Sequence, residues 1–240
     1  MRQKLVLVGN GMAGMRTIEE LLEIAPELYD ITVFGAEPCG NYNRILLSPV
    51  LAGEKRFEDI MLNDEAWYAA RGITLHKGKT VTRIDRKRRI VHADDGTSAA
   101  YDRLLLATGS NPFILPIPGK DLPGVLTFRD IKDVDAMVAA AGSYRHAVVI
   151  GGGLLGLEAA NGLKQRGMNV TVVHLVQTLM ERQLDDTAGA LLQKSLAARG
   201  IEFLLGAETA EIVGKQRVQG VRFKDGRELT ADLVVMAIGI

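Results

Sequence analysis

Two glycine-rich turns are the parts of this chain whose residue types and spacing could do chemistry. Both fit the pattern G-x-G-x-x-G, with its glycines at Gly9, Gly11 and Gly14 and at Gly151, Gly153 and Gly156. In such a turn the first glycine bends the chain, the second lets the backbone approach a pyrophosphate, and the third lets a helix pack closely on a strand. The helix then offers its first amide groups and its positive dipole end to the phosphates. The residues expected to supply these amides are Met12, Ala13, Leu154 and Leu155.

A pattern of this kind is informative only where a buried strand precedes it and a helix follows it. Here an apolar strand is predicted over residues 4–8 before the first turn and over residues 147–150 before the second. Apolar residues recur at helical spacing after each turn, and a second β-rich segment follows each helix, at 31–34 and 170–173. The chain is therefore interpreted as two copies of one plan.

Both copies also end alike, with an apolar strand followed by a small residue and glycine. The first ends at Thr108-Gly109 and the second at Ile238-Gly239, and short strands with turn signals precede each ending. The predicted fold is α/β, with two Rossmann-like three-layer dinucleotide-binding domains in tandem, each with a β-meander. We expect the domains at residues 1–115 and 116–240, since four prolines within 111–124 predict an inter-domain linker.

The end of the second strand in each copy is where such sites usually place an acidic residue on the ribose hydroxyls. Glu37 is the candidate in the first copy, and a solvated loop glutamate is the alternative. His174 occupies the corresponding place in the second copy, and a surface histidine without a ligand is the alternative.

Composition excludes several other classes of protein. The formal net charge of zero gives no reason to expect nucleic acid or an anionic membrane as a partner. A single cysteine, Cys39, cannot form an intrachain disulfide or ligate an iron–sulfur cluster, and the four histidines lack metal-ligand spacing. No pattern pairs a nucleophile with a base, so neither a catalytic side chain nor a metal site is predicted. A cytoplasmic protein is expected.

Two further stretches carry a resemblance to a known family. Residues 41–54, NYNRILLSPVLAGE, and residues 178–185, TLMERQLD, resemble the N-terminal flavin module of the NAD(P)H-dependent nitrite reductase large subunit. The tandem glycine patterns resemble the wider flavoprotein disulfide-reductase superfamily, and the resemblance covers essentially the whole chain. It implies FAD in the first domain and NAD(P)H in the second, with hydride passing from the nicotinamide to the flavin. It also suggests that NADH is preferred over NADPH, by about tenfold or ~1.4 kcal/mol.

The resemblance also implies roles for individual residues. In the first domain Glu37 would bind the adenosine ribose, Arg44 would lie beside the flavin's phosphates or ring, and the backbone of Val81 would meet the adenine. Thr108 and Gly109 would pack beside the FAD. In the second domain Glu158 would face the nicotinamide, and His174 and Gly239 would line the NAD(P)H site. The flavin's electrons would pass to iron–sulfur clusters and sirohaem on downstream domains or a small subunit, which reduce nitrite to ammonium in nitrate assimilation.

Two departures leave alternatives open. Related ferredoxin and rubredoxin reductases carry Ser-Lys where this chain has Ser48-Pro49, which argues against a stand-alone reductase of that type. The chain also ends directly after the second strand-end glycine, where superfamily members return to the first domain. The FAD-binding domain is therefore expected to lack a strand. A non-catalytic nucleotide-binding module is the remaining alternative.

Overall fold

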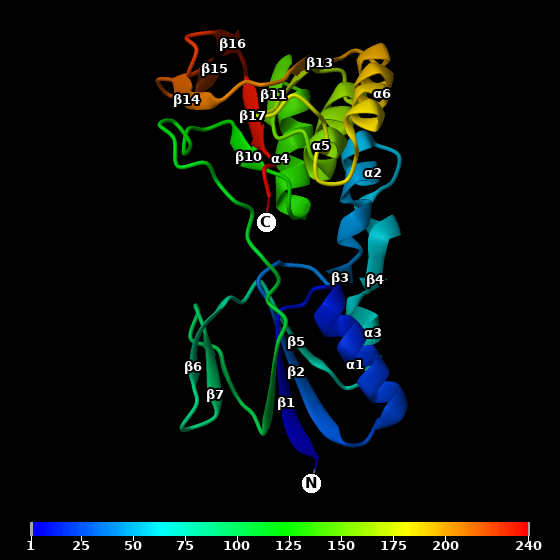
Figure 1. Ribbon diagram of the computed structural model, residues 1–240. Coiled ribbons are helices and arrows are strands. Elements are labelled where there is room, and N and C mark those ends of the chain that lie inside the picture. Colours follow the sequence, from blue (N-terminus) through cyan, green and yellow to red (C-terminus); the bar gives the residue numbers. More distant parts are fainter. Residues whose placement is uncertain (1, 240) are drawn as a thin grey trace. The chain divides into compact units, whose positions relative to one another are not determined.

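The computed structural model describes residues 2–239, which form two compact units (Figure 1). Unit 1 comprises the chain up to Arg44 together with Glu58–Ser110. Unit 2 comprises Ile45–Phe57 together with the chain from Asn111. None of the helices within these residues is long and apolar enough to cross a membrane.

Unit 1 is built on a four-stranded parallel sheet with the order β5-β2-β1-β9. Its strands are β1 (Gln3–Val8), β2 (Tyr29–Gly35), β5 (Thr74–Lys77) and β9 (Arg103–Leu106). The central strand β1 is apolar and buried over its last four residues, as expected for a parallel strand that is covered on both faces. A small antiparallel pair lies apart from this sheet: β3 (Asn41–Tyr42) and β4 (Met61–Asn63).

Alternate residues of β1 enter two different cores, which gives unit 1 three layers. Leu7 packs with Met15, Ile18 and other side chains of the helical layer, whereas Val6 packs against a three-stranded antiparallel sheet. The helices are α1 (Met12–Ile24) and α3 (Glu65–Ala70), and the antiparallel strands are β6 (Val81–Asp85), β7 (Ile90–Ala93) and β8 (Ser98–Ala100). Figure 1 shows α1 and the β6–β7 hairpin on opposite sides of β1 and β2.

Unit 2 repeats this plan with one more strand. Its parallel sheet has the order β10-β17-β11-β12-β13. These strands are β10 (Val125–Thr127), β11 (His146–Ile150), β12 (Asn169–Val173), β13 (Ile201–Leu204) and β17 (Leu233–Met236). The helices are α4 (Ile131–Ala141), α5 (Leu154–Gln165) and α6 (Asp186–Ala198), and the antiparallel strands are β14 (Thr209–Gly214), β15 (Val218–Phe223) and β16 (Glu228–Thr230).

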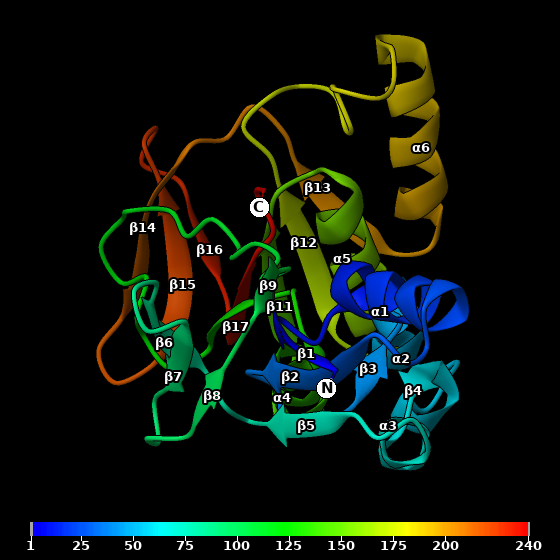
Figure 2. The ribbon, with the colours of Figure 1, turned by 90° about the horizontal axis from the view of Figure 1, so that it is seen from below.

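The layers of unit 2 match those of unit 1. Val148, Ile150 and Val173 pack against the antiparallel strands in one core with Val221 and Phe223. Figure 2 shows β14–β16 and α5 on opposite sides of the parallel strands. In each unit the chain passes to one side of the strand that precedes the glycine turn, β1 or β11, and later returns on its other side. The switch in strand order therefore falls between β1 and β9 and between β11 and β17. The predicted tandem three-layer α/β fold is confirmed.

The compact units differ from two contiguous domains in the placement of residues 45–57. This segment contains the last two residues of η1 (Arg44–Leu46), all of α2 (Leu47–Ala52) and the first residue of η2 (Phe57–Ile60). Helix α2 packs on α5, where Gly162 leaves room for the buried Leu51. The Arg166 guanidinium donates hydrogen bonds to the carbonyls of Leu51 and Val50, at 2.7 and 3.0 Å. The segment therefore belongs to unit 2.

The proline-rich stretch at 111–124 also belongs to unit 2, although the sequence predicted a linker. Leu115, Ile117 and Leu122 pack against the core of that unit. The amide of Phe113 donates to the carbonyl of Gly239, and the carbonyl of Pro118 accepts from Ile212, both at 2.9 Å. Prolines interrupt regular structure, but apolar side chains between them still attach the stretch to the sheet.

Candidate functional site

The first and third glycines of both patterns are required by the fold itself. A Cβ on Gly9 would lie 2.1 Å from the carbonyl oxygen of Ala107, and one on Gly151 would lie 2.2 Å from that of Ala237. Both residues also have positive φ, 108° and 125°, which other residues rarely adopt. The third glycine, Gly156, allows α5 to approach the strand, since its Cβ would lie 2.0 Å from the Gly151 carbonyl oxygen. The turns have the same geometry in the two units.

The middle glycines, Gly11 and Gly153, are not required by the fold. Both have extended backbone, with φ of −92° and −83°, that any residue adopts. A Cβ added at either position would meet no neighbouring atom of the described chain within 4 Å. Neither backbone conformation nor packing within residues 2–239 therefore explains glycine here. Open space at this position of the turn is what a pyrophosphate needs in order to reach the backbone.

The helices that follow these glycines leave their first amides available. Gly11 and Gly153 are the N-caps of α1 and α5, and in the described chain no side chain caps either helix. By contrast, α3, α4 and α6 are capped by the side chains of Asp64, Asp130 and Asp185. An uncapped helix N-terminus beside an open glycine turn can bind an anion, because the first amides of a helix have no partner within the helix.

In unit 1 the first glycine turn is fixed by Asn10. Its amide nitrogen donates to the carbonyl of Cys39 at 3.3 Å, and its oxygen accepts from the Tyr68 hydroxyl at 2.6 Å. Burial raises the pKa of Tyr68 to about 12, although the bond to Asn10 acts in the opposite direction. Tyr68 therefore keeps its proton and remains a donor. This anchor positions the turn in front of α1.

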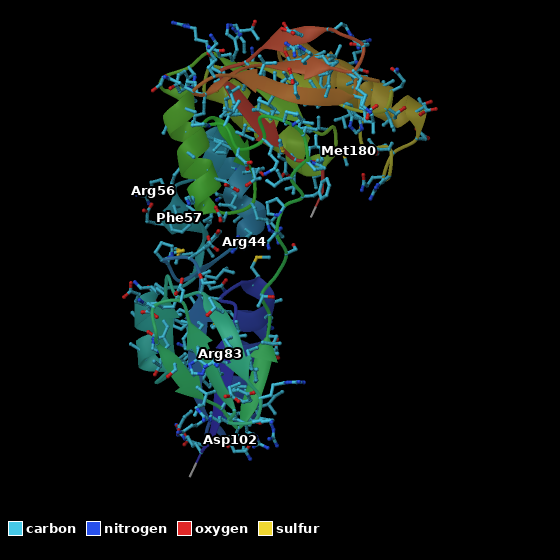
Figure 3. The ribbon with its side chains drawn as sticks, turned by 90° about the vertical axis from the view of Figure 1, so that its left-hand side faces the viewer. Arg44, Arg56, Phe57, Arg83, Asp102 and Met180 are labelled. Carbon is cyan, nitrogen blue, oxygen red and sulfur yellow. The ribbon has the colours of Figure 1, made fainter. Side chains whose placement is uncertain are left out.

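The structure brings Glu37 and Arg44 together, close to the carboxyl end of β2. Glu37 accepts a hydrogen bond from the Tyr42 hydroxyl at 2.6 Å and forms an ion pair with Arg44. The Arg44 guanidinium (labelled in Figure 3) also lies over the Tyr42 ring, 5.2 Å from its centroid. A carboxylate has capacity for more than these two bonds, so it still has acceptor sites for ribose hydroxyls.

Three other residues predicted for unit 1 lie on separate elements. Val81 begins β6 and packs with the antiparallel layer. Thr108 and Gly109 follow β9 and are exposed, and the Thr108 backbone nitrogen would lie 3.0 Å from a Cβ on Gly9. The carboxyl ends of β1 and β9 therefore meet at the glycine turn, which is the usual ligand side of such a sheet.

Unit 2 has a cavity of about 770 Å³ at the carboxyl ends of its parallel strands. Six of the eight residues predicted for this unit line it: Gly151, Gly153, Leu154, Leu155, His174 and Gly239. The other two, Gly156 and Glu158, do not. The volume suits a nucleotide, and the position at the switch between β11 and β17 is typical of dinucleotide sites.

Part of the cavity wall is apolar and was not predicted from the sequence. Phe113 and Ile117 come from the stretch expected to be a linker, and Leu175 and Val176 follow His174. Phe113, Leu175 and Val176 are exposed. Exposed apolar side chains gathered in a concave site are typical of ligand pockets. The single signal in the sequence is the apolar character of residues 113–117, which prolines obscure.

Glu158 lies in a second, smaller cavity of about 280 Å³, which α2 and α5 both line. It accepts a hydrogen bond of 2.6 Å from the hydroxyl of Ser48. The Ser48-Pro49 pair therefore places a neutral hydroxyl beside Glu158. Residues 2–239 contain no group of three or more His, Cys, Asp and Glu side chains that could hold a metal ion.

The geometry defines a protein with two dinucleotide-binding domains of one topology. Comparison with known proteins agrees. Residues 3–240 match the pyridine nucleotide-disulphide oxidoreductase family, and the chain belongs to that family. Its members are oxidoreductases that use FAD and NAD(P)H. The predicted class of enzyme and its cofactors are confirmed.

The chain is also similar to individual proteins. The chain is 58% identical over 239 residues to a nitrite reductase [NAD(P)H] of Bacillus subtilis, a match that covers 100% of this chain and 30% of that protein. It is 50% identical to the assimilatory nitrate reductase electron transfer subunit of the same organism, of which it covers 31%. A ferredoxin reductase from Rhodopseudomonas palustris superposes with a TM-score of 0.91 at 29% identity, over 99% of this chain and 59% of that one. The chain thus spans less than a third of the length of the two Bacillus subtilis relatives. The predicted resemblance to NAD(P)H-dependent nitrite reductase is confirmed.

Proposed function

We propose that this chain is the NAD(P)H:FAD oxidoreductase module of a nitrite reductase. The observation that carries the proposal is the pair of middle glycines, which the fold does not need and which leave open space beside two uncapped helices. Each unit thereby has the backbone approach that a dinucleotide pyrophosphate requires. The identity of 58% to a nitrite reductase supports assignment to this branch of the family.

The residues of unit 1 fit FAD. Gly11 and the first amides of α1, at Met12 and Ala13, would hold its pyrophosphate. Glu37 would accept from the adenosine ribose, and Arg44 would balance the charge of the phosphates or meet the flavin ring. The backbone of Val81 would meet the adenine, with Thr108 and Gly109 beside the cofactor.

The cavity of unit 2 fits NAD(P)H. Gly153 and the amides of Leu154 and Leu155 would hold the pyrophosphate, and the apolar wall would cover the nucleotide bases. Gly239, which follows β17, lines this cavity. Glu158 lies in the smaller cavity beside α2 and would face the nicotinamide side from there. The bound flavin supplies the chemistry, accepting a hydride and releasing its electrons singly, while the protein contributes placement and electrostatics.

The wider role comes from the relatives. We propose that the module works in the cytoplasm within a longer protein or together with a small subunit. Downstream iron–sulfur and sirohaem domains would receive the electrons and reduce nitrite to ammonium. The assimilatory role is supported by the 50% identity to a nitrate reductase electron transfer subunit.

An anaerobic titration tests the hydride transfer. Protein loaded with FAD is mixed with NADH, and the loss of flavin absorbance is followed together with NADH consumption. We expect one flavin to be reduced for each NADH consumed. The control variant Gly153→Val, which alters the NAD(P)H turn alone, should keep FAD but lose this reduction. Binding of both nucleotides without any reduction of the flavin would overturn the proposal and favour a non-catalytic nucleotide-binding module.

A further inference from the structure

His174 stands where an acidic residue is usual, but its ring is already engaged on both sides. The Gly152 amide donates to His174 Nδ1 at 3.1 Å, and His174 Nε2 lies 3.0 Å from Glu181 Oε2. Because Nδ1 accepts a hydrogen bond, the ring proton resides on Nε2, which donates to the carboxylate. The imidazole side chain is only 11% exposed. His174 therefore connects the glycine turn to Glu181.

Gly152 is held from both sides by the loop that follows β12. Its amide donates to His174, and its carbonyl accepts from the Met180 amide at 3.0 Å. Met180 (labelled in Figure 3) has a φ of 53°, rare for a residue other than glycine. A Cβ on Gly152 would lie 2.7 Å from the His174 ring. The loop thus fits tightly over the glycine turn and fixes the position of residue 181.

Glu181 lies in the wall of the large cavity, as do Gly152, Gly153 and His174. Partial burial alone would raise the pKa of Glu181, but hydrogen bonds from its own backbone amide and from His174, with the charge of Arg182, lower it. The carboxylate is therefore ionised at neutral pH. His174 uses one of its oxygens, and a carboxylate has a second oxygen with further acceptor sites.

We infer that Glu181, positioned by His174, binds the adenosine-ribose hydroxyls of the nicotinamide nucleotide and makes this site favour NADH over NADPH. The inference rests on the proposed NAD(P)H site and adds the residue that selects the nucleotide. A carboxylate accepts hydrogen bonds from the ribose 2′-hydroxyl and repels a 2′-phosphate. In this site the carboxylate comes from the loop after β12 rather than from the strand end itself.

Equilibrium binding of NADH and NADPH to the unaltered protein and to Glu181→Gln tests the inference. Glutamine keeps the size of the side chain and removes its charge. The variant loses a hydrogen bond to a charged group and the repulsion of a 2′-phosphate, so the ratio of the NADPH to the NADH dissociation constant should fall by about tenfold or more. Glu208→Gln removes a charge from the same cavity wall, and Glu202→Gln removes an exposed one on β13. Neither should change the ratio by more than about twofold.

Two substitutions of His174 separate its two hydrogen bonds. His174→Asn keeps an acceptor near the Nδ1 position but loses the donor to Glu181, whereas His174→Gln keeps a donor near the Nε2 position. We expect the first to lower the nucleotide ratio and the second to preserve it. In the Glu181→Gln background, His174→Asn should change the ratio no further, because a positioning residue acts only through its partner.

The outcomes separate this inference from the proposed function. If neither nucleotide binds the unaltered protein, the NAD(P)H site itself is wrong. If both bind, but the ratio is the same in Glu181→Gln or shifts equally in Glu208→Gln, then Glu181 is not the selecting residue although the site stands. An unaltered protein that binds NADPH more tightly than NADH also overturns the inference.

Discussion

Replacing Gly153 with valine should abolish NAD(P)H binding and leave the fold intact. The backbone at this position is extended, and a Cβ would meet no neighbouring atom of the described chain within 4 Å. Valine is a poorer N-cap than glycine, but it also reduces the entropy of the unfolded chain, and each effect amounts to about 0.5–1 kcal/mol. The free energy of unfolding should therefore change by less than ~1 kcal/mol, and Tm by less than about 4 °C.

The effect on binding should be far larger. The valine methyl groups would occupy the space through which a pyrophosphate reaches the helix amides. Two hydrogen bonds to a charged group contribute about 3–6 kcal/mol, so the NADH dissociation constant should rise at least about 100-fold. Gly11→Val should do the same to FAD in unit 1, and neither variant should affect the other nucleotide. Isothermal titration with each nucleotide, with thermal unfolding in parallel, measures both effects.

Gly156→Ala provides the contrast. Its Cβ would lie 2.0 Å from a backbone oxygen of Gly151, so the helix or the strand must move. Overpacking against backbone should cost about 3 kcal/mol, which lowers Tm by roughly 6–12 °C. A Gly156→Ala variant as stable as the unaltered protein would show that the third glycine does not serve the fold. Normal NADH binding by a folded Gly153→Val variant would show that the middle glycine does not serve a ligand.

Three further predictions concern residues that position the two sites. Burial raises the pKa of Tyr68 to about 12, above its value in the unfolded chain. The free energy of unfolding should therefore fall by roughly 2–3 kcal/mol as the pH rises from about 10 to 12. Urea unfolding of Tyr68→Phe should show no such decline. Gly162→Ala should lower Tm by about 2–12 °C, because its Cβ would lie 2.6 Å from Cγ of the buried Leu51, and a Tm within 1 °C of the unaltered protein would contradict the packing of α2 on α5. Ser48→Ala should cost about 1–2 kcal/mol in urea unfolding, since Glu158 loses its hydroxyl partner. A cost that persists in the Glu158→Ala background, which lacks the acceptor, would show another cause.

The glycine patterns were readable in the sequence because their requirements are local. A strand, a turn and a helix within a few residues fix the geometry of Gly9 or Gly151, and the same order of elements in both halves predicts the same sheet twice. Six of the eight residues predicted for unit 2 consequently line one cavity. Strand limits differed by one or two residues, as at β2 (Tyr29–Gly35), which extends beyond the predicted 31–34.

Long-range packing could not be read in the same way. The attachment of α2 to α5 depends on Gly162, more than 100 residues away from Leu51, and no periodicity links two such positions. Glu181 lies in an irregular loop whose course is fixed by single hydrogen bonds to Gly152. The inferred role of Glu181 in nucleotide selection depends on how this loop folds back onto the glycine turn. The number of residues between Glu181 and the turn does not reveal that course.

The two glycine turns differ in whether the turn or the end of the second strand carries the larger side chain. This difference accounts for the different positions of Glu37 and Glu181 along the chain. Phe34 and Val173 accept the same hydrogen bond from the first glycine of their turns, so Gly35 corresponds to His174. In unit 1 the turn carries Asn10 and the strand end carries glycine, whose Cβ would lie 2.8 Å from the Cβ of Asn10.

In unit 2 the turn carries glycine at 152, and the strand end carries the large side chain of His174. Only one large side chain fits between the turn and the strand end. Unit 1 places it on the turn, and unit 2 places it on the strand end. In unit 1 the larger side chain, Asn10, is on the turn and the strand end carries only glycine. The acidic residue Glu37 follows that glycine by two residues. When the strand end holds an imidazole, its Nε2 proton points outward and needs an acceptor. Glu181 supplies that acceptor, because the bond from the Met180 amide to the Gly152 carbonyl holds the loop where the carboxylate lies 3.0 Å from Nε2.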